Sequence, residues 1–140
     1  MDTFVWRDDY SVGYTLIDEQ HRELFSRINA FGNALWEGQG KELLAAHLRF
    51  LAEYVVSHFQ TEEGLMKTHR FPLYEDHKPV HDAFVAEVSS VLNRIADGGL
   101  DTATAIMVFE KSCDWIRAHV RGMDQELGHF LGAQADSTAA

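Results

Sequence analysis

The chain has 140 residues, 46% of them hydrophobic, and a formal net charge of −10 at neutral pH. This length predicts one domain with one core, and the acidic balance argues against nucleic acid or an anionic membrane surface as a partner. No apolar run approaches the roughly 20 residues that span a bilayer. The N-terminus has aspartates where a signal peptide has a basic and then an apolar run. Cys113 is the only cysteine and rules out an internal disulfide, so we expect a cytoplasmic protein.

The first 17 residues contain bulky apolar side chains without a helical period, and they predict an aromatic arm lying across a bundle. The first helix is expected to begin near Asp18, a favourable N-cap residue, and to end at about Trp36. Its apolar residues recur every three or four positions, and His21 lies on the same stripe. The stripe consists of Ile17, His21, Leu24, Phe25, Ile28, Phe31 and Leu35.

The second and third helices also carry polar residues on their apolar faces. The second is expected over about 41–67, with the stripe Leu44, Leu48, Leu51, Val55, His58, Glu62 and Leu65. The third lies between Pro72 and Ala96, with the stripe His77, His81, Phe84, Val88, Val91 and Ile95. Pro79 leaves two starts open, because proline is tolerated in the first turn of a helix but kinks its interior. The helix begins either near Asp76, or at Pro72 with a kink.

A fourth helix is expected from Asp101 or Thr102 to about Arg121, with His119 on its core face. Four long amphipathic segments with short connections predict an all-α fold, an antiparallel up-down-up-down four-helix bundle with an N-terminal aromatic arm. We assign residues 1–132 to this domain and expect residues 133–140, which are small and polar, to form a flexible tail.

The polar residues on the inward faces have the spacing of metal ligands. His58 and Glu62 are four residues apart, as are His77 and His81, so each pair shares one face of its helix. Asp124 follows His119 by five residues, which requires a π-bulge or a helix end between them, and Gly122 permits either. Buried and unpaired, such groups would cost about 1–3 kcal/mol each. We therefore predict a metal site, although imidazole also suits zinc, copper and nickel. The predicted ligands are His21, His58, Glu62, His77, His81, His119 and Asp124.

The order and spacing of these residues resemble hemerythrin, most closely the single-domain bacterial hemerythrins. The run Ile17-Asp18-Glu19-Gln20-His21 and Trp6 in the arm also resemble the bacterial branch, and the likeness covers roughly residues 4 to 130. The resemblance implies two non-haem iron ions with a bridging oxide or hydroxide that bind dioxygen reversibly, and small anions such as azide in the ferric form.

The resemblance also implies a role for each residue. His77, His81 and His119 would hold one iron, His21 and His58 the other, and Glu62 and Asp124 would bridge them. One coordination position would stay open at the iron held by His21 and His58. An oxygen pocket is expected from Phe59, Trp115, Ile116 and Val120. His47, His69 and His129 are not expected to be ligands.

One departure from the family pattern follows the bridging aspartate. Many members have a tyrosine three residues after it, where this chain has Leu127. Any hydrogen bond from that tyrosine is therefore missing here or supplied by another group. Glu126 lies close enough in sequence to be considered as an extra ligand, although we expect it to be solvated.

Three functional classes use such a site: an oxygen-binding protein for storage, delivery or sensing, a di-iron enzyme such as a peroxidase or nitric-oxide-processing protein, and a sensory module acting through a partner. The ferritin-like di-iron enzymes use four carboxylates and paired Glu-x-x-His motifs, which this chain lacks at the corresponding positions. A histidine-rich site stabilises high-valent iron less well. We therefore favour oxygen binding and expect the protein not to be an enzyme.

Overall fold

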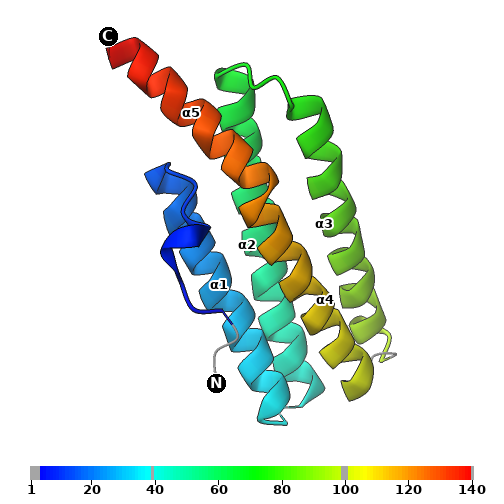
Figure 1. Cartoon of the computed structure of the whole chain (residues 1–140). Helices are drawn as coiled ribbons and strands as arrows, with labels where there is room; N and C mark the ends of the chain where they lie inside the picture. Colours follow the sequence, from blue (N-terminus) through cyan, green and yellow to red (C-terminus); the bar gives the residue numbers. More distant parts are fainter. Residues whose placement is uncertain (1–3, 39, 99–100, 140) are drawn as a thin grey trace.

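A computed structural model describes residues 4–38, 40–98 and 101–139 of the chain. In these ranges every regular secondary-structure element is a helix (Figure 1). The elements are η1 (Asp8–Tyr10, a 3₁₀ helix), α1 (Thr15–Trp36), α2 (Lys41–Thr68), α3 (Tyr74–Ala96), α4 (Thr102–Arg121) and α5 (Met123–Ala139).

The first four α-helices form the predicted antiparallel bundle. α1 packs against α2 and α4, and α2 packs against α3. α5 follows α4 after one intervening residue and projects beyond the end of the bundle (Figure 1). The arm before α1 lies across the outside of the bundle, and η1 contacts α4. The four-helix-bundle prediction is confirmed.

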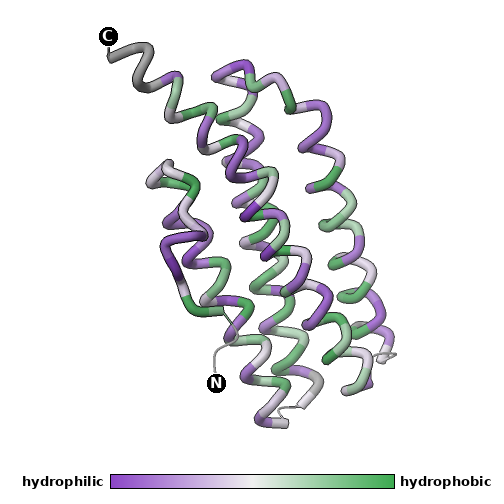
Figure 2. The backbone as a smooth tube through the Cα atoms, in the orientation of Figure 1, coloured by the Kyte–Doolittle hydropathy of each residue, from purple (hydrophilic) through white to green (hydrophobic). Residues whose placement is uncertain are grey.

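Hydrophobic residues recur along the bundle helices between hydrophilic ones, as amphipathic packing requires (Figure 2). The predicted stripe of α1 is buried throughout. The buried apolar residues fall into two clusters. The larger fills most of the bundle, and the smaller consists of Val12, Ile17, Met66, Phe71, Leu127 and Leu131. Five of the buried histidines and carboxylates lie in sequence between residues of the two clusters: Glu62, for example, stands between Phe59 of the larger and Met66 of the smaller. His58 and His119 are flanked on both sides by residues of the larger cluster.

The first helix begins three residues earlier than predicted, and Asp18 is not its N-cap. The N-cap position is Tyr14, whose side chain makes no capping hydrogen bond. The Asp18 carboxylate instead accepts hydrogen bonds from the Val12 N–H at 2.8 Å and from the Ser11 hydroxyl at 2.5 Å. Asp18 therefore fastens the arm to α1, a tertiary role that the capping signal did not reveal.

The corner between α2 and α3 is closed by backbone hydrogen bonds. Arg70 has a φ of +55°. Its N–H donates to the Lys67 carbonyl at 3.3 Å, and the Phe71 N–H donates to the Met66 carbonyl at 2.8 Å. This is the Schellman pattern, in which a left-handed residue ends the helix and an apolar contact follows. The contact here is between Phe71 and Met66, both in the smaller cluster.

The third helix begins at Tyr74, between the two starts that the sequence left open. Pro79 lies inside the helix, past its first turn. Proline lacks an N–H, so the Glu75 carbonyl loses its regular helical partner at this point. The fourth helix begins at Thr102, as expected, and the Asp101 carboxylate accepts a hydrogen bond from the Thr104 N–H at 2.7 Å.

The last helix was not predicted as a separate element. α5 continues to Ala139, across most of the segment expected to be a tail, while residue 140 lies outside the described residues. Whether residues 133–140 are flexible stays a prediction.

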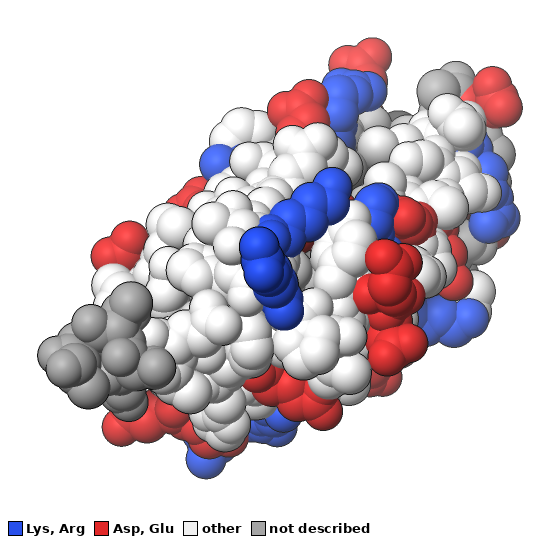
Figure 3. Space-filling model, turned by 90° about the horizontal axis from the view of Figure 1, so that it is seen from above, with Lys and Arg blue, Asp and Glu red and all other residues white. Residues whose placement is uncertain are grey.

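None of the described helices is long and apolar enough to cross a membrane. On the face shown in Figure 3, basic and acidic side chains are interspersed over a largely uncharged surface.

Candidate metal centre

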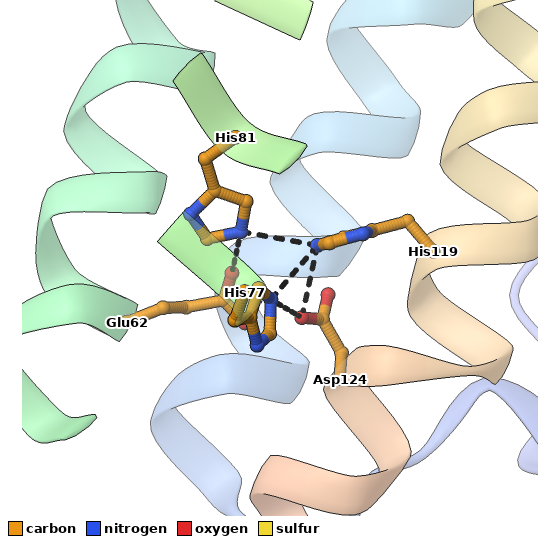
Figure 4. Close-up of side chains that lie close together, drawn as sticks. All are labelled: Glu62, His77, His81, His119 and Asp124. Carbon is orange, nitrogen blue, oxygen red and sulfur yellow. Dashed lines mark hydrogen bonds and ion pairs between the residues drawn. The ribbon is translucent and has the colours of Figure 1, made fainter. Parts of the chain in front are cut away.

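The structure brings all seven predicted ligands together in the interior of the bundle. They form two groups, in each of which one ligand atom per residue lies within 4.8 Å of the others. Both carboxylates, Glu62 and Asp124, belong to both groups. The first group adds His77, His81 and His119, whose side chains point into a common space in Figure 4, and the second adds His21 and His58.

The secondary structure explains how these side chains meet. His58 with Glu62 on α2, and His77 with His81 on α3, are pairs four residues apart on one helical face. His21 extends from the buried stripe of α1. His119 lies in the last turn of α4.

Asp124 reaches the centre because the chain breaks at Gly122. α4 ends at Arg121, and α5 begins at Met123. Gly122 has φ −104° and ψ −92°, and its N–H still donates to the Ala118 carbonyl at 2.9 Å. Of the two geometries that the spacing allowed, the structure has the helix end.

Each carboxylate faces histidines of both groups. The Asp124 oxygens lie 3.0 Å from His21 Nε2, 3.2 Å from His77 Nε2 and 3.3 Å from His119 Nε2. The Glu62 oxygens lie 3.3 Å from His58 Nε2 and 3.4 Å from His81 Nε2. Both carboxylates therefore lie within 3.4 Å of histidine nitrogens of the two groups.

Several donor atoms of the centre lack hydrogen-bond partners among the described residues, which tests whether a metal fits. The buried atoms without a hydrogen bond among the described residues include both oxygens of Glu62 and of Asp124, and Nε2 of His21 and of His58. His119 Nε2 lies 3.1 Å from His77 Nε2 and 3.0 Å from His81 Nε2, so three ring nitrogens converge. Unpaired buried polar atoms are costly. A pair of cations would satisfy them, and imidazole with carboxylate is a donor set that suits iron.

Burial keeps two of the imidazoles, those of His58 and His81, in the form that binds metals. Burial, and secondarily the nearby His21, lowers the pKa of His58 to about 3. Burial, and secondarily His119, lowers the pKa of His81 to about 2. Both rings are therefore neutral near pH 7, as metal ligation requires.

The two carboxylates have opposite pKa shifts. Burial, followed by the charge of Asp124, raises the pKa of Glu62. Burial also acts to raise the pKa of Asp124, but the nearby His119, followed by His21 and His77, lowers it well below its usual value. The raised pKa of Glu62 means that a second negative charge is disfavoured in this interior unless positive charge is added, and bound cations would supply that charge.

A small apolar cavity of about 10 Å³ adjoins the centre. Its lining includes all four residues predicted for an oxygen pocket, Phe59, Trp115, Ile116 and Val120. It also includes Leu24, Val55 and Phe84, which the sequence reasoning missed. Their signal was present, because each lies three residues from a ligand on the same helix: His21, His58 and His81 respectively.

Aromatic rings fix the orientation of two of the imidazoles. Phe59 stacks on His81 with ring centroids 3.7 Å apart, and Trp115 stacks on His119 at 4.5 Å. Phe84 in turn stacks on Trp115, with ring centroids 4.0 Å apart. Packing on rigid rings holds the ligands in place before any metal binds.

Two further polar residues contact the outer edges of the imidazoles and were not predicted. Gln20 Oε1 lies 2.7 Å from His58 Nδ1, and Glu63 Oε2 lies 2.9 Å from His81 Nδ1. Such outer contacts fix the tautomer and orientation of a ligating histidine. The only sequence signal for them was that each directly adjoins a predicted ligand.

The residues set aside in the sequence lie away from the centre. His69 Nδ1 lies 3.1 Å from the Gln134 amide oxygen, and His129 is exposed. Glu126 is exposed, as expected for a solvated side chain, and belongs to neither group of donor atoms. Leu127, at the position where many members have a tyrosine, is fully buried and packs in the smaller apolar cluster.

Comparison with known proteins decides the family. The profile of the family described as the hemerythrin HHE cation binding domain matches residues 12–131. The chain belongs to the hemerythrin family. It is 30% identical to a bacteriohemerythrin of Stenotrophomonas maltophilia over 139 residues, which cover 99% of this chain and 88% of the relative. It is also 30% identical to a hemerythrin chain of Sipunculus nudus, over 93% of this chain and 95% of the relative.

Solved hemerythrin structures have the same fold. A wild-type hemerythrin crystal structure superposes with a TM-score of 0.82 at 23% identity, covering 92% of this chain and 98% of the other. A single-residue mutant of hemerythrin gives a TM-score of 0.83 at 24% identity, over 94% and 98% of the two chains. The α1–α5 arrangement described above is thus a hemerythrin fold.

Proposed function

We propose that this hemerythrin binds dioxygen reversibly at a non-haem di-iron centre between its four helices. The observation that carries the proposal is the division of seven buried ligands into two groups that share both carboxylates. One mononuclear ion would not use such a set. Two adjacent ions would, with Glu62 and Asp124 between them.

The assignment of ligands follows the two groups. His77, His81 and His119 would hold one iron, His21 and His58 the other, and Glu62 and Asp124 would bridge the pair together with an oxide or hydroxide. The position with two histidines would then have the open coordination site. The iron pair supplies the electrons that reversible dioxygen binding requires.

The surrounding residues keep this site dry. The cavity beside His21 and His58 is closed by apolar side chains, with Ile116 and Val120 both about 1% exposed. Water and anions promote loss of bound dioxygen as a reduced species, and an apolar lining excludes both. Imidazoles bind metals in their neutral form, so the two carboxylates would set the charge of the protein ligands.

The composition of the cavity favours an oxygen-binding protein over an enzyme. Among the described residues that line it, the titratable ones are His21, His58, His119 and Asp124, all of them proposed ligands. No side chain there is left to act as a general acid or base, which peroxide or nitrogen-oxide chemistry would require. Dioxygen, and azide in the ferric form, are therefore the proposed partners.

We also infer a cytoplasmic location from Cys113. It is the only cysteine of the chain, and it is buried as a free thiol. A lone structural thiol is typical of proteins in reducing compartments.

An optical cycle tests the function. Iron-loaded protein is deoxygenated and reoxygenated while its visible spectrum is recorded, and metal content is determined by elemental analysis. We expect two irons per chain and visible bands that disappear and return over repeated cycles. One metal per chain, a preference for zinc, or a single irreversible bleach would contradict the proposal.

A further inference from the structure

Two histidines of the centre have hydrogen-bond partners of different charge on their outer edges. His58 Nδ1 lies 2.7 Å from the neutral Gln20 amide oxygen, and His81 Nδ1 lies 2.9 Å from the Glu63 carboxylate. Both oxygens accept from a ring N–H, so both contacts place the proton on Nδ1 and leave Nε2 free for a metal. The contacts therefore select the same tautomer and differ in charge.

Neighbouring side chains hold each partner in its orientation. The Gln20 amide N–H donates to the Thr61 hydroxyl at 3.4 Å, and Thr61 in turn donates to the Ser57 carbonyl at 3.2 Å. This fixes the amide oxygen toward His58. Glu63, whose side chain is 16% exposed, has Lys78 Nζ 3.6 Å from its other oxygen. Its carboxylate is thus largely screened from water and aimed at His81.

The charged partner and the neutral partner contact different groups of the centre. His81 belongs to the group with three histidines, and His58 to the group with two. Nδ1 of His21 and of His77 has no hydrogen-bond partner among the described residues. A carboxylate that accepts from a ligating imidazole raises its basicity and makes it a stronger donor to the metal, whereas an amide does so less.

We propose that Glu63 and Gln20 make the two iron positions electronically unequal. As positioning residues that act through the imidazoles, Glu63 stabilises the ferric state at the three-histidine position, and Gln20 keeps the two-histidine position electron-poor and receptive to an incoming ligand. This inference rests on the proposed di-iron function. It assigns the preference for one position to the outer contacts as well as to the number of ligands.

Exchanging the two partners tests the inference, because glutamine and glutamate have nearly the same shape. The variants are Glu63→Gln, Gln20→Glu and the double exchange, which keeps the overall charge of the wild type. Glu53→Gln, at an exposed position of α2, is the control for a change of net charge alone. The measurements are iron content, the midpoint potential of the centre, and the azide affinity of the ferric protein.

The two single exchanges are expected to shift the midpoint potential in opposite directions. Glu63→Gln keeps both irons and raises the midpoint potential, by about 59 mV for each tenfold change in a one-electron equilibrium, with azide affinity close to that of the wild type. Gln20→Glu lowers the potential and weakens azide binding, on the order of tenfold. The double exchange restores the potential toward the wild type but keeps the weakened azide binding.

Two outcomes would overturn the inference: wild-type azide affinity in the double exchange, or a potential in Glu63→Gln no different from that in Glu53→Gln. If Glu63→Gln does not load iron, Lys78→Gln tests the inference instead, because it keeps the hydrogen bonds of Glu63 and Gln20 to the imidazoles. Removing that positive charge should lower the potential, and a rise would contradict the proposal. None of these measurements involves dioxygen. A wild type that holds two irons but fails to oxygenate reversibly would therefore count against the function and not against this inference.

Discussion

The Asp124 carboxylate lies 3.3 Å from His119 Nε2, although Asp124 follows His119 by five positions in the chain. On an unbroken α-helix this spacing would place the side chains roughly 140° apart around the axis. The break at Gly122 removes the conflict, because His119 lies in the last turn of α4 and Asp124 in the first turn of α5. The irregular backbone at this point is a requirement of the site.

Removing the bridging Glu62 should disable metal binding. Its oxygens lie 3.3 Å from His58 Nε2 and 3.4 Å from His81 Nε2, so Glu62→Ala deprives both proposed ions of a ligand. We expect loss of iron by elemental analysis and a lower melting temperature. The lost stability is that of bound metal, about 4 kcal/mol when free metal exceeds its Kd a thousandfold. His47→Ala, also on α2, is the control and should keep full iron. Equal loss of iron in both variants would show that the assignment on α2 is wrong.

Opening the cavity at Ile116 should shorten the life of the oxygenated protein. Ile116→Ala removes three carbons from a side chain that is 1% exposed and lines the cavity. We expect a loss of about 2–5 kcal/mol of stability, unchanged iron content, faster autoxidation and faster azide binding to the ferric form. Decay of the visible bands measures autoxidation. A variant that keeps both irons and autoxidises at the wild-type rate would rule out Ile116 as a guard of the oxygen site.

Two glycines of α5 should respond in opposite directions to alanine. A Cβ at Gly128 would overlap the Val12 carbonyl oxygen, whereas a Cβ at Gly132 would have no atom within 4 Å. Gly128→Ala must push the arm away and should cost about 1–3 kcal/mol. Gly132→Ala should stabilise the helix by up to about 1 kcal/mol. Denaturant unfolding of both variants tests the contact, and equal stabilities would mean that the arm does not pack against α5 in solution.

The thiol of Cys113 should be inert in the folded protein. Burial raises its pKa to about 12, so the folded thiol stays protonated at pH 9 while an unfolded one is half ionised. Its contribution to stability is therefore present below about pH 9 and lost as the pH rises toward 12. Iodoacetamide at pH 9 should label the unfolded chain and leave the native chain unlabelled. Rapid labelling of the native protein would show that the core around α4 opens readily.

The helices and their inward faces were predictable because helical periodicity is a local property. His58 and Glu62 share a face at four residues' separation whatever surrounds them, and the same holds for His77 and His81. Once four such faces are packed in a bundle, their polar residues have one interior to meet in. For this reason the convergence of the seven residues could be predicted before the structure, although the sequence alone left the metal open.

The remaining features depend on contacts between distant segments. Asp18 is a residue type that favours N-cap positions, but here it accepts hydrogen bonds from Ser11 and Val12 of the arm. Helix propensity and capping preferences do not predict such a contact. Gly122 allowed two geometries, and only the packed bundle selects the helix end. Gln20 and Glu63 could not be distinguished from other polar neighbours, because each contacts a ring on a different helix.

The position of Asp124 in the chain also bears on how the protein acquires its metal during synthesis. His21 Nε2 and an Asp124 oxygen lie 3.0 Å apart, yet they are the first and last of the seven ligands along the chain. A nascent chain on the ribosome therefore has an incomplete set of donors until the segment after Gly122 has emerged. Until then, Glu62 is the only carboxylate of the seven able to join the two halves. Iron taken up before that point would lack its second bridge, so with the proposed ligands complete loading would have to wait until this segment is available.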